Sequence, residues 1–213
     1  VVDNDVNSKE NDGLMYEFNL RGGSVPTATP TPTPTSTPPA TVTPVGTPTP
    51  TPVPGAQLTI NPSDDTFVRS DWPNSNYSTN TTLRLVGSPI INSYLKFNVS
   101  GLSVTPQSVK LRLYVNDPST NGGAIYLVSN NYNGTSTAWV ESGLKYNNAP
   151  PVSGTPLSSL GSVATGTWVE FNVTDAVTGN GTYSFAITSS STNSVYYNSK
   201  DAGSNTPVLV ISQ

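Results

Sequence analysis

The sequence predicts an all-β protein whose main part is a jelly-roll-like β-sandwich of about ten strands. Apolar and polar residues alternate in several short runs, as in 111–115, where Leu111, Leu113 and Val115 fall on one face. This period of two is typical of a half-buried strand. Gly, Asn, Ser and Pro separate the runs, and these residues favour turns between antiparallel strands. No stretch shows the periodicity of an amphipathic helix, so an α-helical layer is not expected.

Residues 1–23 form an N-terminal segment that contains one predicted strand. Residues 1–13 are polar and acidic, and 14–20 (LMYEFNL) then alternate in the manner of a strand. The face of this assembly strand carries Leu14, Tyr16, Phe18 and Leu20. It has no neighbouring hairpin partner, and a lone strand is not stable in water. It could pair in its own sandwich, add to the sheet of a neighbouring copy, or be the remnant of an upstream domain.

Residues 24–55 form a Thr/Pro-rich linker. The stretch 26–54 contains 11 prolines and 11 threonines in 29 residues. Proline removes an N–H group and fixes φ, so an extended polyproline form of about 90 Å is expected. Thr-Pro repeats are also typical of O-glycosylated stalks, although an unmodified spacer would have the same composition. The candidate glycosylation sites are Thr27, Thr29, Thr31, Thr33, Thr35, Thr37, Thr41, Thr43, Thr47, Thr49 and Thr51.

Residues 56–213 form the predicted sandwich domain. Residues 175–177 could form one helical turn between two strands. The strand-like runs are 57–60, 66–69, 82–86, 93–99, 109–115, 124–129, 137–141, 167–173, 183–188, 195–198 and 207–211.

Composition excludes several classes of function. The chain has a net charge of −4 and no basic cluster, so a nucleic-acid partner is not expected. No apolar run reaches the length of a membrane span. His and Cys are both absent, which removes disulfides, thiol nucleophiles and histidine-dependent triads. The acidic residues form no recognisable pair, so the sequence predicts a protein without catalytic activity. Its polar but weakly charged composition is typical of secreted or cell-surface β proteins.

The order of motifs from residue 64 onward resembles the DNRLRE-type domain, also classed as carbohydrate-binding module family 96. The resemblance implies a secreted bacterial β-sandwich, often attached to polysaccharide-degrading enzymes or surface proteins, and some such domains are reported to bind acidic polysaccharides. The sequence departs from the family where Tyr146 stands in place of a frequent Trp, and where Lys200-Asp201 stands in place of Arg-Glu. The segments that carry the resemblance are DDTFVRSDWPNSNY (64–77), SYLKFNVSGL (93–102), VKLRLYV (109–115), YNNAPP (146–151), GTWVEFNVTDAVTGNGTYSFAIT (166–188) and YYNSKDAGSNTPVLVIS (196–212).

Three aromatic residues are candidates for carbohydrate binding, namely Trp72, Trp139 and Tyr146. A flat ring can cover the apolar face of a pyranose while neighbouring amides bind its hydroxyls. All three tryptophans could instead be packing residues. Trp168 lies inside a predicted strand and is expected in the core.

No cofactor is required by any of these patterns. Asp64, Asp65 and Asp71 supply oxygen ligands close together in the sequence, so a structural calcium ion is conceivable there. The spacing of an EF-hand loop is absent, and solvated loop carboxylates are the alternative.

Two hypotheses of function follow. The first is a secreted structural subunit that assembles into a fibre or surface layer by donating strand 14–20 to a neighbouring copy, with covalent glycans on the linker. The second is a carbohydrate-binding module that the linker tethers to a polysaccharide-degrading or cell-surface protein. The expected partners are therefore copies of the chain, attached glycans and a polysaccharide.

Overall fold

The computed structural model describes residues 57–213, which form eleven β-strands and three single-turn 3-10 helices. The predicted strand 14–20 and the linker 24–55, with its candidate glycosylation sites, lie outside the described residues. The strands are β1 (Gln57–Ile60), β2 (Asp64–Arg69), β3 (Thr82–Gly87), β4 (Ile90–Val99), β5 (Ser108–Asp117), β6 (Gly123–Val128), β7 (Ser158–Leu160), β8 (Trp168–Asn172), β9 (Gly181–Thr188), β10 (Val195–Asn198) and β11 (Val208–Ser212). The helical turns are η1 (Glu141–Gly143), η2 (Tyr146–Asn148) and η3 (Thr174–Ala176).

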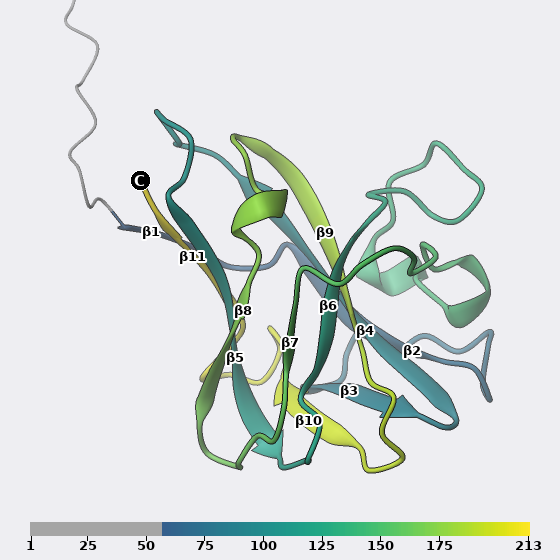
Figure 1. Ribbon diagram of the computed structural model, residues 1–213. Helices are drawn as coiled ribbons and strands as arrows, with labels where there is room; N and C mark the ends of the chain where they lie inside the picture. The colour runs from purple at the N-terminus through teal and green to yellow at the C-terminus, as the bar shows by residue number, and fades with distance from the viewer. Residues whose placement is uncertain (1–56) are drawn as a thin grey trace, which may run out of the picture. The chain divides into compact units, whose positions relative to one another are not determined.

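The strands are arranged as two layers of antiparallel sheet (Figure 1). The β4 sheet has the order β2-β4-β9-β6-β7. The β5 sheet has the order β1-β11-β5-β8. At one end β10 also pairs with β5, and β3 connects β10 to β4, so hydrogen bonds run continuously from one layer to the other.

The alternation of apolar and polar residues along the strands explains how the two layers pack against each other. In β5, Val109, Leu111, Leu113 and Val115 are buried, whereas the residues between them point away from the core. The opposite layer contributes Phe97 and Phe185, whose ring centroids lie 6.3 Å apart. Burial of these apolar side chains between the sheets is the main force that stabilises the sandwich.

The predicted β-sandwich is confirmed, and all but one of the predicted runs coincide with a strand. Residues 137–141 were expected to form a strand, but they make only an isolated bridge between Asn131 and Ala138 before the helical turn η1. Their alternation serves to bury Trp139 against a sheet face rather than to pair with a neighbouring strand. Strand β7 was not expected, because its three residues are too few to show a period. The helical turn near 175–177 is present as η3.

Two loops pack against the β4 sheet, and the first of them covers its outer face. The long loop, residues 129–157 between β6 and β7, packs its apolar residues on this face and forms a second apolar cluster with Val68, Tyr94 and Ala186. The Trp72 loop, residues 70–81 between β2 and β3, covers a smaller cluster that includes the stacked rings of Phe67 and Tyr77. Within residues 57–213, no helix is long and apolar enough to cross a membrane.

Candidate functional site

Trp72 is the most exposed large apolar side chain of the described residues, with 61 % of its surface accessible. The residue before it is fixed by a forked ion pair, because Arg69 Nε and Nη2 lie 3.0 and 2.6 Å from the two carboxylate oxygens of Asp71. The hydrogen bonds from Arg69 lower the pKa of the Asp71 carboxyl and keep it ionised. The backbone that carries the exposed indole is therefore held in place at the end of β2.

The Trp72 loop is also braced against the long loop. The backbone N–H of Asn147 donates to the Pro73 carbonyl at 3.2 Å, and its side-chain amide donates to Asn74 Oδ1 at 2.8 Å. Asn76 Nδ2 donates to the carbonyls of Glu141 and Leu144 at 2.6 and 2.8 Å. These bonds hold Trp72 and the η2 turn that carries Tyr146 in a fixed relation, which lowers the entropy lost on binding a ligand.

A groove of about 300 Å³ lies between the long loop and β4. We call it the Tyr146 groove, and its lining residues are Ile90, Asn92, Tyr94, Tyr146, Ala149, Pro150, Pro151 and Val152. The Trp72 loop borders it, because the Ser70 N–H donates to the Ile90 carbonyl at 2.9 Å and the Ile90 N–H donates to Ser70 Oγ at 3.0 Å. Aromatic rings, proline rings and one amide line the groove, and none of these side chains is charged. Such a lining suits the apolar faces and hydroxyls of a sugar.

Trp139 does not contribute to this surface, since it is completely buried. Its indole N–H donates to Ser184 Oγ at 3.1 Å, and the Lys96 ammonium lies 4.0 Å from the ring centroid and donates to the Trp139 carbonyl. The prediction that Trp139 stacks on a sugar is therefore corrected. The residue anchors the long loop to the outer face of the β4 sheet, and so supports the groove from beneath.

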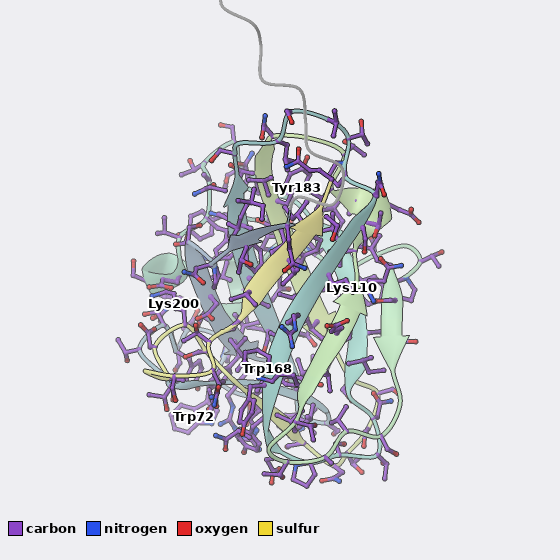
Figure 2. The ribbon with its side chains drawn as sticks, turned by 90° about the vertical axis from the view of Figure 1, so that its left-hand side faces the viewer. Trp72, Lys110, Trp168, Tyr183 and Lys200 are labelled. Atoms are coloured by element: carbon purple, nitrogen blue, oxygen red, sulfur yellow. The ribbon has the colours of Figure 1, made fainter. Side chains whose placement is uncertain are left out.

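Trp168 was expected in the core, and this expectation is wrong. Its side chain is 37 % exposed and lies on the outer face of the β5 sheet, where Figure 2 shows it with Lys110. The alternation in β8 could have shown this, because Phe171 faces the core while Trp168 and Glu170 share the opposite face.

The surroundings of Trp168 leave little of its ring free for a ligand. Tyr114 contacts the ring edge-on at 5.4 Å, and the Arg112 guanidinium lies 5.1 Å from the ring centroid. Lys110 and Arg112 both pair with Glu170, at 3.3 and 3.2 Å. The ring is thus already in contact with protein groups, and the Glu170 carboxylate compensates one of the two positive charges beside it.

The three carboxylates considered for calcium do not converge. Asp64 Oδ1 accepts from the Glu141 N–H at 3.1 Å, Asp65 Oδ2 accepts from the Lys200 N–H at 2.7 Å, and Asp71 pairs with Arg69. Within residues 57–213, no three or more His, Cys, Asp or Glu side chains are grouped closely enough to hold a metal ion. Asp64, Asp65 and Asp71 therefore do not form a common site for a calcium ion.

Asp65 is instead a buried structural carboxylate. Only 1 % of the residue is exposed, and its Oδ1 has no hydrogen-bond partner among the described residues. Burial raises the pKa of Asp65 to about 7, because the Lys200 N–H offsets only part of the desolvation and the nearby Glu141 adds repulsion. Lys200 also pairs with Glu141 at 3.0 Å and with Asp201 at 3.2 Å. This cluster ties β2 to the turn after β10.

Comparison with known protein families gives a match for the sandwich part of the sequence. The family model described as carbohydrate-binding module family 96 matches residues 56–213. No curated protein matches the chain.

Proposed function

The chain belongs to carbohydrate-binding module family 96, and we propose on this basis that its sandwich is a non-catalytic domain that binds polysaccharide through Trp72 and the Tyr146 groove. The exposed indole would stack on one sugar ring, and the groove would hold the next part of the chain. The domain would then keep whatever protein it is joined to close to the polysaccharide. The domain would bind the polysaccharide outside the cell, because a polar but weakly charged composition is typical of secreted β proteins.

One observation carries the proposal: an indole that is 61 % exposed stands on a braced loop that borders an uncharged aromatic groove. A tryptophan kept in water forgoes burial worth about 1.5–3 kcal/mol. The braces from Asn147 and Asn76 show that this exposure does not come from a loose loop. A ligand that covers the indole would recover that burial, and the groove beside it supplies the hydrogen-bonding groups that orient a sugar.

A glycan array tests the proposal. The wild-type chain should bind at least one polysaccharide, and Trp72→Ala and Tyr146→Ala should each weaken that binding at least tenfold, or about 1.4 kcal/mol. Trp168→Ala is the matched control, because it removes a partly exposed indole from the opposite sheet. Binding that survives Trp72→Ala but is lost in Trp168→Ala would contradict the proposed surface.

The fibre hypothesis rests on strand 14–20, and O-glycosylation rests on the linker threonines; both stay predictions about residues outside the described range. Deletion of residues 1–23 followed by negative-stain microscopy tests the first of them. Fibres that the wild type forms and the deletion variant does not would support strand donation. A wild type that forms no fibres would contradict the fibre hypothesis. A surface fibre could still hold polysaccharide, so the two functions are compatible.

A further inference from the structure

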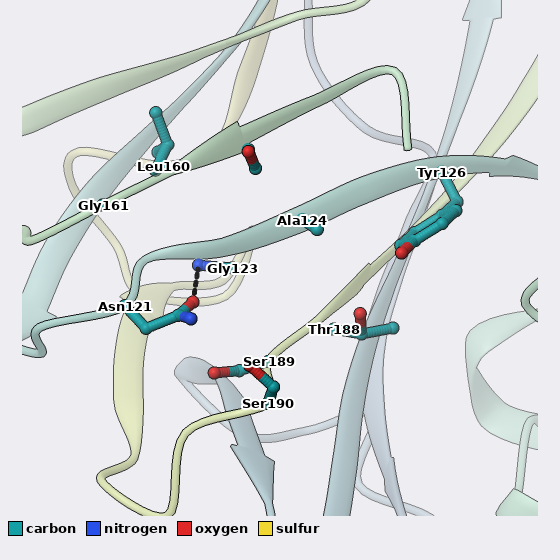
Figure 3. A pocket seen from close by; sticks show the side chains of 10 residues that line it. Asn121, Gly123, Ala124, Tyr126, Leu160, Gly161, Thr188, Ser189 and Ser190 are labelled. Carbon is teal, nitrogen blue, oxygen red and sulfur yellow. Dashed lines mark hydrogen bonds between the residues drawn. The ribbon is translucent and has the colours of Figure 1, made fainter. Parts of the chain in front are cut away.

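A second pocket lies on the outer face of the β4 sheet, over β6, β7 and β9. It has a volume of about 330 Å³ and opens to solvent (Figure 3). Its lining residues are Asn121, Gly123, Ala124, Tyr126, Ser159, Leu160, Gly161, Thr188, Ser189 and Ser190. We call it the Ala124 pocket.

The register of the strands explains its shape. Ala124 pairs with Thr188 of β9 on one side and with Ser159 of β7 on the other. A methyl group thus forms the floor, and hydroxyl-bearing side chains stand on both neighbouring strands, about 10 Å apart at the usual strand spacing. Two residues further along β6, Tyr126 projects from the same face and its ring forms a wall, as Figure 3 shows.

The polar groups of the pocket are available to a ligand. Among residues 57–213, the hydroxyls of Ser159, Thr188 and Tyr126 take part in no hydrogen bond with another side chain or the backbone. Asn121 is held in place because its Oδ1 accepts from the Gly123 N–H at 2.9 Å, which leaves its Nδ2 free to donate (Figure 3). Several hydroxyls, one amide and one aromatic ring are the groups that sugar recognition uses.

The lining also selects the charge of the ligand. None of the ten lining residues is charged. A carboxylate that entered would lose hydration without gaining a cationic partner, which is costly. A neutral sugar would exchange its water hydrogen bonds for those of the protein. The chemistry therefore fits an uncharged pyranose.

The pocket continues the Tyr146 groove across the sheet. Asn92 of the groove and Thr188 of the pocket each lie one residue beyond the β4–β9 pair Ser93–Ile187. Both side chains face outward, so the two cavities are neighbours on one sheet face. The distance from β4 to β7 is three strand spacings, or about 14 Å, which a few sugar units would cover.

We infer that the Ala124 pocket binds a neutral pyranose unit of the same polysaccharide chain that Trp72 and the Tyr146 groove hold, so that the chain runs across β4, β9, β6 and β7. This inference rests on the proposed function. It adds the neutral character of the ligand, the direction of the chain over the sheet, and a dependence of affinity on chain length.

Calorimetric titration of the full chain tests it with a fixed set of probes: cello-, manno- and xylo-hexaose, the corresponding disaccharides, and hexagalacturonate. At least one neutral hexasaccharide should bind more tightly than its disaccharide. Ala124→Leu, which fills the floor, and Thr188→Val, which removes a hydroxyl at nearly constant shape, should each weaken the hexasaccharide about tenfold. Neither should affect the disaccharide held at Trp72. Ala164→Leu is the matched control, since Ala164 is exposed and lines neither cavity.

The outcomes separate this inference from the proposed function. If Trp72→Ala abolishes binding while both pocket variants bind the hexasaccharide like the wild type, the inference is wrong and the proposed function stands. If only hexagalacturonate binds, the neutral assignment is overturned. If no probe binds, the inference is wrong, and the glycan array decides the proposed function separately. Unchanged thermal unfolding of Ala124→Leu and Thr188→Val confirms that a lost affinity does not come from a lost fold.

Discussion

At the scale of single residues, the three tryptophans of the chain occupy three different environments. Trp72 is exposed on a braced loop, Trp139 is buried beneath the long loop, and Trp168 lies on the outer face of the opposite sheet. The same side chain therefore serves as a proposed ligand contact, as an anchor and as part of a surface ion-pair cluster. Position relative to the sheets, rather than residue type, decides among these roles.

Replacing the anchor should destabilise the whole domain. Trp139→Ala removes a fully buried ring, its bond to Ser184 and its contact with Lys96, so we expect a loss of about 3–5 kcal/mol in the free energy of unfolding. Urea unfolding followed by circular dichroism measures this loss. Trp168→Ala serves as the control and should cost less than about 1 kcal/mol. Equal losses in the two variants would contradict the anchoring role.

The buried Asp65 should make stability depend on pH. An acid whose pKa is raised in the folded state, here from 3.8 to about 7, stabilises the fold only while it stays protonated. Its contribution is full below pH 3.8, is lost as the pH rises to about 7, and is constant above that. Asp65→Asn keeps an oxygen that can accept from the Lys200 N–H but cannot ionise.

The variant should therefore gain stability relative to the wild type as the pH rises. The difference in free energy of unfolding, variant minus wild type, should increase between about pH 4 and pH 7 and then level off. Urea unfolding of both proteins at about pH 4, 6 and 8 gives this difference directly. A difference independent of pH would mean that Asp65 ionises as easily in the folded state as in the unfolded state.

At the scale of elements, much of the fold could be predicted from the sequence, because alternation reports burial wherever a strand has one face in the core. In β5 the pattern places Leu111, Leu113 and Val115 correctly. The same signal misleads at 137–141, where one buried ring on a loop imitates a strand. It is absent in the three residues of β7. Trp72 was identified because it lies in a loop, but the groove and the Ala124 pocket depend on contacts between distant segments.

The brace between the two loops should contribute to affinity without contacting the ligand. Asn147→Ala removes the bond to Asn74 Oδ1 but leaves the backbone bond to Pro73 in place. We expect a loss of about 0.5–1.5 kcal/mol in binding free energy, because the Trp72 loop must then be ordered when the ligand binds. Calorimetric titration measures the affinity, and hydrogen exchange of residues 70–81 measures the mobility. Faster exchange with unchanged affinity would show that the loop is not part of the binding surface.

At the scale of the whole molecule, the largest apolar cluster within residues 57–213 joins the two sheets of the sandwich in one core. A fragment of residues 56–213 should therefore unfold in one cooperative transition, with a Tm within about 2 °C of the full chain. It should also bind the same polysaccharide with the same affinity. Differential scanning calorimetry of the two proteins provides the comparison. A Tm lower by more than about 4 °C would show that residues 1–55 stabilise the sandwich, as pairing of strand 14–20 within its own chain would do.

The surface that meets the ligand can be observed directly, because the chain contains only three tryptophans and each lies in a different part of the sandwich. The measurement is an NMR titration: an oligosaccharide that the protein binds is added to the ¹⁵N-labelled full chain. The three indole N–H signals are followed, and each is assigned by a Trp→Phe variant. We predict that the Trp72 signal shifts in a saturable manner while the Trp168 signal stays in place. A saturable shift of Trp168 with an unchanged Trp72 would place the ligand on the β5 sheet and contradict the proposed binding surface.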